Sequence, residues 1–523
     1  MLWVCRRWYH ALLPLVWSTV SVYQWHHPSF PIRPLVTPSK DPALLPYLSL
    51  IRHIFWADNI LVSSTTPATK PLKTIARQMS ASRFAWLLHN SPNLATLSLR
   101  RYCSGFDPVF YHAVAAMPNL KSLCIHAPSH KTRIPIEDMF PLFARLEELH
   151  IAGFWYNQEG LTGSRFLNSI KTTPWRLKKL KCNRPDWALA LYCPDLTFFE
   201  ILSTEPFSTP LAISLRFLLA FPKLETVKLP YKAGRDSFTD LIYTLQSLKA
   251  LRSLTFNICR KEELEFLCSP YFDSQITYTM QNEDPTSNQA RKGQGLLSLP
   301  LLEYLHIHHI NLRDNYEACF RMLHNILVTR VNLKSFQVNR EILNPTYMFA
   351  RPGQEARDDW GCKGLESLVF SMAKSMYLRT AEEDWAYWQP IYRQLGQLSR
   401  LESIEIKCSK VQVDKNSGIL QLSGAKNLKR LVLRGTESVK WTRKEVLDLL
   451  MVLPKLEILQ VKPLKKGFFL KIKAWLCEAG RADVAFNEES DHEPSEEDII
   501  RLERSRVHYR RESKRARFML RRG

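Results

Sequence analysis

The sequence is poor in glycine and lacks the cysteine patterns that hold small secreted or zinc-binding folds together. Glycine occurs 17 times in 523 residues, which excludes collagen-like and glycine-rich chains. The 11 cysteines are scattered, and no two stand in CxxC spacing, so neither a disulfide framework nor a zinc finger is expected. The single Asn-x-Ser/Thr triplet, Asn344-Pro345-Thr346, contains a disqualifying proline. These absences predict a protein of the cytoplasm or the nucleus.

Motifs of catalysis and metal binding are absent as well. The sequence contains no P-loop, GxGxxG, GxSxG, HExxH or EF-hand loop, so we predict that the protein is not an enzyme and needs no cofactor. The one dense histidine cluster is His306-Ile307-His308-His309. We favour a surface histidine pair there over a metal site.

Long apolar runs are missing too. No stretch approaches the roughly 20 residues of a membrane-spanning helix. Residues 11–17 follow Arg6-Arg7 as the core of a signal peptide would, but this run is short and contains Pro14. We therefore expect neither secretion nor a membrane partner.

Positive charge exceeds negative charge. The formal net charge is +22, which favours acidic partners. Residues 477–523 form a predicted charged tail, acidic from Glu488 to Asp498 and basic from Arg501 to Arg522. The basic run is either a solvated, partly helical arm or a nuclear-localisation or nucleic-acid patch at residues 510–517. We favour the solvated arm because short basic clusters are frequent.

One phrase recurs through the chain: a leucine, two variable residues, an apolar residue, a variable residue and an apolar residue. A degenerate copy begins at Ile51, and the spacing is mostly that of a leucine-rich repeat. The 51 residues between Leu251 and Leu302 have room for a missed repeat or an insertion. The thirteen copies begin at Leu94, Leu120, Leu146, Leu177, Leu196, Leu224, Leu251, Leu302, Leu333, Leu365, Leu401, Leu428 and Leu456.

The phrase predicts a short strand, because its last two apolar residues fall on one strand face. Segments with helical spacing lie between the phrases, so strands and helices alternate and the strands must be parallel. We predict an α/β leucine-rich-repeat solenoid over residues 48–476, with parallel strands on the concave face and helices on the convex face. Ordinary βα units are the less favoured alternative.

The first residues carry a second pattern. Within the sequence from Val4 to Val20, the residues Cys5, Arg6, Arg7, Trp8, Leu12, Leu15 and Trp17 match the last third of an F-box. Together with the repeats, the chain resembles the F-box/leucine-rich-repeat proteins that are abundant in fungi. The family's motif opens earlier, with Leu-Pro-x-Glu, so the F-box at residues 1–25 is expected to be partial. Residues 26–47, with six prolines from Pro28 to Pro46, are a predicted semi-rigid linker.

The resemblance implies the substrate-recognition subunit of a Skp–cullin–F-box ubiquitin ligase, which binds a protein substrate through its repeats. Its partners would be a Skp-type adaptor and the cullin ligase core. The alternative is a repeat scaffold without ligase function that binds an acidic protein or, less expected, nucleic acid. The resemblance implies an adaptor-binding set of Val4, Cys5, Trp8, Leu12, Leu15 and Trp17.

The substrate surface is predicted from the strand pattern. The variable residue between the last two apolar positions, and the residues two before and two after it, point away from the helices. These columns are rich in basic residues and predict an acidic or phosphorylated protein substrate; a solvated face whose charge only aids solubility is the alternative. The predicted substrate-binding residues are Arg100, Lys179, Lys181, Phe198, Lys228, Tyr304, Lys407, Arg430, Arg434 and Lys462.

Overall fold

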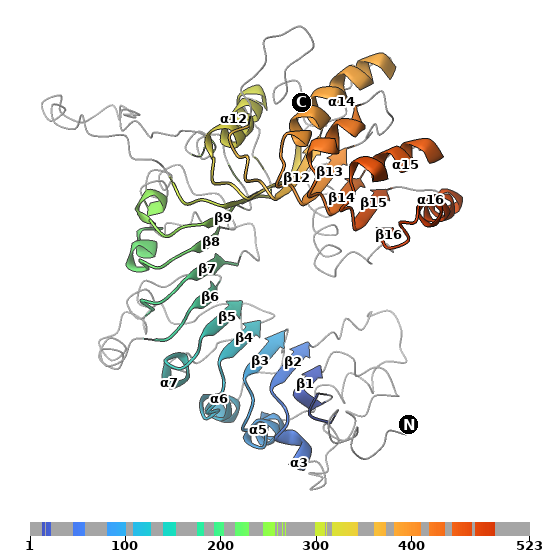
Figure 1. Ribbon diagram of the computed structural model, residues 1–523. Helices are drawn as coiled ribbons and strands as arrows, with labels where there is room; N and C mark the ends of the chain where they lie inside the picture. Colours follow the sequence, from blue (N-terminus) through green and yellow to red (C-terminus); the bar gives the residue numbers. More distant parts are fainter. Residues whose placement is uncertain are drawn as a thin grey trace, which may run out of the picture. The chain divides into compact units, whose positions relative to one another are not determined.

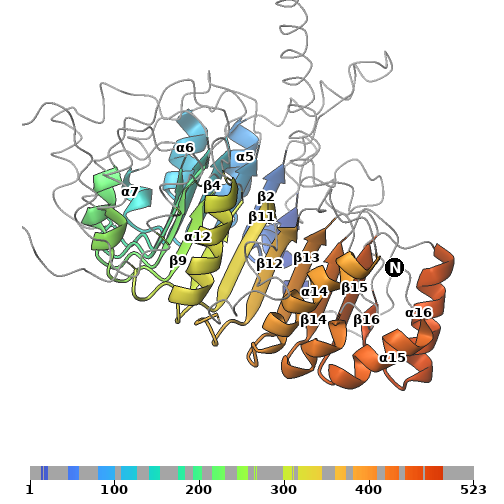
Figure 2. The same ribbon diagram turned by 90° about the horizontal axis from the view of Figure 1, so that it is seen from above.

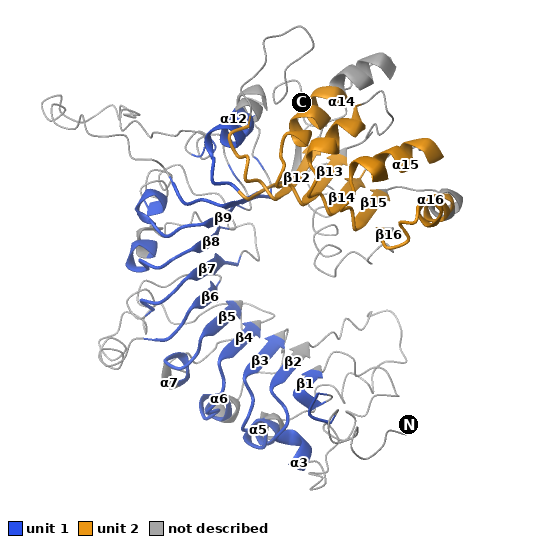
Figure 3. Cartoon of the chain, in the orientation of Figure 1, with its two compact units in different colours: residues 1–333 blue, residues 334–523 orange. Residues whose placement is uncertain are grey.

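The computed structural model has α/β architecture and falls into two compact units, residues 1–333 and 334–523 (Figure 3). Each unit is described by itself. The structure describes residues 13–15, 17–21, 45–57, 81–100, 108–126, 140–152, 175–182, 193–202, 215–229, 244–256, 259, 264, 267, 299–308, 310, 316–343, 360–372, 381–408, 418–434, 442–462 and 466–486.

In unit 1 the strands pair in parallel and in sequence order (Figure 1). They are β1 (Thr19–Ser21), β2 (His53–Ala57), β3 (Thr96–Arg100), β4 (Ser122–His126), β5 (Glu148–Ala152), β6 (Lys179–Cys182), β7 (Phe198–Ile201), β8 (Thr226–Leu229), β9 (Ser253–Phe256) and β10 (Tyr304–Ile307). The helical segments are α3 (Leu45–Leu48), α5 (Ala81–His89), α6 (Pro108–Ala115), α7 (Phe140–Phe143), η5 (Leu215–Ala220) and α12 (Tyr316–Thr329).

Unit 2 repeats this arrangement, again with parallel strands in sequence order. Its helices lie on one side of its strands, as the view from above shows (Figure 2). The strands are β11 (Ser335–Leu343), β12 (Ser367–Met372), β13 (Ser403–Cys408), β14 (Arg430–Arg434), β15 (Ile458–Lys462) and β16 (Ala485–Phe486). The helical segments are α14 (Ala381–Gly396), η8 (Ile419–Gly424), α15 (Arg443–Val452) and α16 (Lys466–Glu478).

All thirteen copies of the phrase form strands, from β3 to β15. The apolar residues of the phrase form the core: Leu97, Leu123, Ile125 and Leu149 are at most 1% exposed. The degenerate copy at Ile51 forms β2. The structure thus confirms a repetitive α/β fold of parallel strands, in which each repeat covers the apolar face of the next.

The long gap between Leu251 and Leu302 is an insertion and not a missed repeat. Strand β10 pairs directly with β9, with Tyr304 opposite Ser253. Within the insertion, the described Leu267 is held in place by buried Arg330, which donates from Nε and Nη2 to the carbonyl of Leu267 at 2.9 and 2.7 Å. No strand therefore separates β9 from β10.

The sheets extend beyond the predicted limits of residues 48 and 476. Thr19–Ser21 forms β1, which pairs in parallel with β2, and Ala485–Phe486 pairs with β15. Of the predicted helical segment 1–25, residues 13–15, 17 and 18 are helical. Of the predicted linker 26–47, only residues 45–47 are described, and they belong to α3. The acidic and basic runs of the tail lie outside the described residues.

An asparagine ladder joins successive repeats. Where asparagine precedes the first leucine of the phrase, its Nδ2 donates to a backbone carbonyl of the preceding repeat. Asn93 donates to Ser49, Asn119 to Pro92, Asn332 to Pro300 and Asn427 to Ser399, all at 2.8–2.9 Å. These bonds satisfy carbonyls in the turns before the strands, where no strand neighbour is available.

Candidate protein-recognition face

In each unit, one face of the strands lies opposite the helices, and we call this face the open face. Every second residue of each strand points to it. Strand register sets which open-face residues are neighbours. In unit 1 the register aligns Cys124, His150, Lys181, Glu200 and Lys228 across β4 to β8. Consecutive repeats therefore bring residues that are distant in the sequence into one row.

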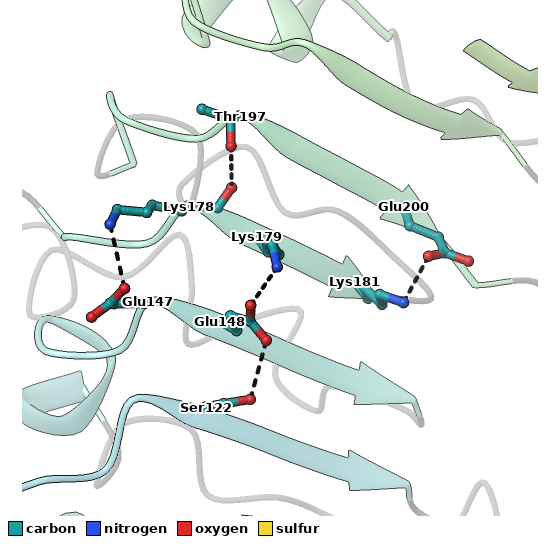
Figure 4. A network of polar contacts seen from close by, with 8 residues as sticks. All are labelled: Ser122, Glu147, Glu148, Lys178, Lys179, Lys181, Thr197 and Glu200. Carbon is teal, nitrogen blue, oxygen red and sulfur yellow. Dashed lines mark hydrogen bonds and ion pairs between the residues drawn. The ribbon is translucent and has the colours of Figure 1, made fainter. Parts of the chain in front are cut away.

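The lysines of this row, and Lys179 of the neighbouring row, are paired with carboxylates, as Figure 4 shows for Lys179 and Lys181. Lys179 Nζ lies 2.6 Å from Glu148 Oε1, and Lys181 Nζ lies 3.1 Å from Glu200 Oε2. Lys228 Nζ lies 3.9 Å from the same oxygen of Glu200. Three cations and two carboxylates leave this part of the open face with a net charge of only +1.

Aromatic residues add apolar area to the same face. Phe198 lies between two lysines, with the Nζ atoms of Lys181 and Lys228 each 5.4 Å from its ring centroid. Such cation–π contacts hold the lysine stems over the ring. Tyr304 on β10 is 43% exposed. Phe198 is therefore partly covered by its neighbours, whereas Tyr304 offers more of its ring to a partner.

A second ladder of charge runs beside the start of the strands. Glu147 lies 3.4 Å from Lys121 and 3.3 Å from Lys178, as Figure 4 shows for Lys178. Hydrogen bonds from these lysines, that from Lys178 first, lower the pKa of Glu147 below its ordinary value. This ladder links three repeats, and its charges are paired with one another.

Among the described open-face side chains, the larger excess of positive charge lies on unit 2. Glu405 on β13 lies between Lys407 at 3.4 Å, Arg434 at 3.0 Å and Arg430 at 4.0 Å. We call these four residues the Glu405 cluster. The carboxylate is 13% exposed, while the three cations are 32–42% exposed. Three cations around one carboxylate give the cluster a net charge of +2.

Amides continue the cluster toward β11. Asn339 Oδ1 accepts from Gln337 Nε2 at 2.8 Å and from Lys407 Nζ at 3.4 Å. Ser371 Oγ donates to the backbone carbonyl of Asn339 at 2.9 Å. The ammonium of Lys407 is thus held between an amide oxygen and a carboxylate, which fixes its position on the open face.

The predicted substrate residues divide between the two units. The side chains of Lys179, Lys181, Phe198, Lys228 and Tyr304 lie on unit 1, and those of Lys407, Arg430 and Arg434 lie on unit 2. Arg100 ends β3 and Lys462 ends β15, but their side chains lie outside the description. The sequence-based prediction missed the amides Gln337 and Asn339, because only charged and aromatic residues were selected from the strand columns.

Little of the predicted adaptor-binding set lies in the described part of the chain. Val4, Cys5, Trp8 and Leu12 fall outside it. Leu15 is 69% exposed. Trp17 stacks on Tyr47 with ring centroids 5.1 Å apart, so this indole faces the helix before β2.

Two other candidate sites are a groove on unit 2 and a histidine pair on β10, whose His306 continues the open-face row beyond Lys228 and Thr255. A groove of about 930 Å³ beside α15 and α16 is lined by Arg443, Leu447 and Met451 among others. Within the described ranges, no group of three or more histidine, cysteine or acidic residues is placed to hold a metal ion. His306 and His308 stand with ring centroids 4.0 Å apart.

No family model matches the chain, and no curated protein matches it either. Among the described helices, none combines the length and apolar character needed to cross a lipid bilayer.

Proposed function

We propose that this chain is a protein-recognition subunit that binds an acidic or phosphorylated protein segment on its open face, chiefly at the Glu405 cluster. The observation that carries the proposal is the excess of three cations over one carboxylate in that cluster. Charges contributed by neighbouring strands suit an extended segment that crosses several repeats.

The Glu405 cluster is better suited to an anion than the open face of unit 1. In unit 1 the cations are nearly balanced by Glu148 and Glu200. In the Glu405 cluster Arg430 and Arg434 share a single carboxylate and remain 42% and 36% exposed. A guanidinium can pair bidentately with a carboxylate or phosphate, so these two arginines are the anchors.

A charge reversal tests this assignment. Arg430→Glu combined with Arg434→Glu should abolish binding of a fluorescein-labelled polyglutamate peptide to the full chain. The matched control is Lys426→Glu with Lys471→Glu, which changes the net charge equally at two exposed positions. Equal loss of binding in both variants would mean that net charge, and not the Glu405 cluster, attracts the peptide. Binding unchanged in the reversed variant would refute the assignment.

We further propose that the protein acts as the substrate receptor of a Skp–cullin–F-box ubiquitin ligase. The support is the F-box-like sequence from Val4 to Trp17 and the exposure of Leu15 within it. The segment would present its apolar residues to the Skp-type adaptor.

Capture of a purified Skp-type adaptor by the full chain tests the ligase role. Wild type should retain the adaptor, and Trp8→Ala or Leu15→Asp should weaken its capture, while polyglutamate binding stays unchanged. A chain that binds polyglutamate and never captures the adaptor would be a repeat scaffold without ligase function.

A further inference from the structure

Cys124 and His150 form a close pair on the open face of unit 1. They are register partners on β4 and β5, and Cys124 Sγ lies 3.2 Å from His150 Nδ1. Both side chains are half-buried. The contact joins either a thiol with a neutral imidazole or a thiolate with an imidazolium, because the imidazole nitrogen can accept or donate.

Three of the other described cysteines, Cys182, Cys193 and Cys362, are buried. Burial raises the pKa of Cys193 and of Cys362 to about 12, and it also raises the pKa of Cys182. These groups stay neutral thiols and are shielded from reagents. Cys124 differs from them because it is partly exposed and has an imidazole at hydrogen-bonding distance, which is the environment of reactive cysteines.

The lysines nearest the pair in register are themselves held in ion pairs. On β6, Lys181 is the register partner of His150 and Lys179 is that of Glu148. Lys179 is paired with Glu148, and Lys181 with Glu200. On the β3 side, the register partner of Cys124 is the neutral Ser98. Because Lys181 is paired with Glu200, its ammonium repels an imidazolium at His150 less than an unpaired lysine would.

We propose that Cys124 and His150 are a reactive thiolate–imidazolium pair that forms mixed disulfides with small disulfides. The proton passes from Cys124 Sγ to His150 Nδ1. The thiolate then attacks one sulfur of the incoming disulfide, a new S–S bond forms, and the second sulfur leaves as a thiolate. The reaction consumes no further oxidant, and a thiol reverses it. This site is independent of the proposed partner binding.

The pH profile of alkylation tests the pair in the full chain. Iodoacetamide labelling is monitored by mass spectrometry of two tryptic peptides. Peptide 122–131 contains Cys124 as its only cysteine, and peptide 474–481 contains Cys477 as its only cysteine. An ordinary thiol loses about a hundredfold in thiolate, and hence in rate, over two pH units below its pKa. We expect Cys124 to slow by less than about tenfold between about pH 8 and about pH 6.

Two variants assign the effect. His150→Gln should restore the steep profile of an ordinary thiol at Cys124. Lys181→Gln, which changes the next residue in the row, should keep the shallow profile. Oxidised glutathione should add to peptide 122–131 in wild type at pH 6 and to a much smaller extent in His150→Gln. A steep wild-type profile, or a shallow profile that persists in His150→Gln, would overturn the proposal. Because the first of these outcomes is measured on the wild-type chain, it does not depend on the folding of any variant.

Discussion

At the residue scale, the leucines of the phrase hold the repeats together by burial. Leu123 is 0% exposed on β4. Leu123→Ala should lower the free energy of unfolding by about 2 to 5 kcal/mol, through lost transfer energy and a cavity. Leu301→Ala is the matched control, because this leucine is 42% exposed and the same truncation there should cost below about 1 kcal/mol. Urea unfolding measures both, and equal losses would contradict the assigned core.

The contribution of Glu147 to the free energy of unfolding depends on pH. Its pKa is lowered by Lys178 and Lys121, so its contribution to stability is present above its ordinary pKa of 4.5 and is lost as the pH falls through the lower folded value. Because these pairs are solvent-exposed, the contribution is below about 1 kcal/mol. Glu147→Gln should be slightly less stable than wild type at pH 7 and equally stable once the carboxylate is protonated. A difference that persists in acid would contradict the ion-pair explanation.

At the element scale, helix α14 packs closely against η8 where Gly396 and Gly424 leave room for the backbones to approach. A Cβ on Gly396 would overlap the carbonyl oxygen of Gln421, and one on Gly424 would overlap that of Gly396. Gly396→Ala should therefore destabilise unit 2 by about 1 to 3 kcal/mol, which outweighs the gain of up to about 1 kcal/mol in helix propensity. The control is Gly364→Ala, whose Cβ would have no atom within 4 Å.

Hydrogen exchange is the measurement for this contact. Amides of α14 and η8 should exchange faster in Gly396→Ala and at the wild-type rate in Gly364→Ala, because only the first change separates the two elements. Unaltered protection in both variants would show that the helices do not depend on this approach.

The repeat phrase was enough to predict every strand from β3 to β15, because burial imposes the same apolar spacing each time. It could not predict β1 and β16, since Thr19–Ser21 and Ala485–Phe486 are too short to contain a phrase. The phrase did not predict the asparagine ladder, because Asn93 and Asn427 lie just before its first leucine and are not part of it. The sequence predicted which strand positions point to the open face. It could not predict which carboxylate each lysine pairs with, because that depends on side-chain geometry between neighbouring strands.

At the scale of the whole molecule, stability accumulates from repeat to repeat, while the proposed recognition depends on local differences in charge. The backbone ladder is uniform: the carbonyl of Lys121 accepts from Glu147 and Glu148 in unit 1, and that of Glu402 accepts from Lys429 and Arg430 in unit 2. The open faces differ, with nearly balanced charge on β5 to β8 and an excess at the Glu405 cluster. A uniform scaffold therefore presents a localised basic site.

The most direct test of this account is the salt dependence of polyglutamate binding to the full chain, followed by fluorescence anisotropy. Between about 50 and about 300 mM salt the wild-type affinity should fall by about tenfold or more, because the cluster's cations are partly exposed and screened. Lys426→Glu with Lys471→Glu should keep that slope, and Arg430→Glu with Arg434→Glu should show no measurable binding at any salt concentration. Wild-type binding that is indifferent to salt, or a reversed variant that keeps the wild-type slope, would contradict the Glu405 cluster as the recognition site.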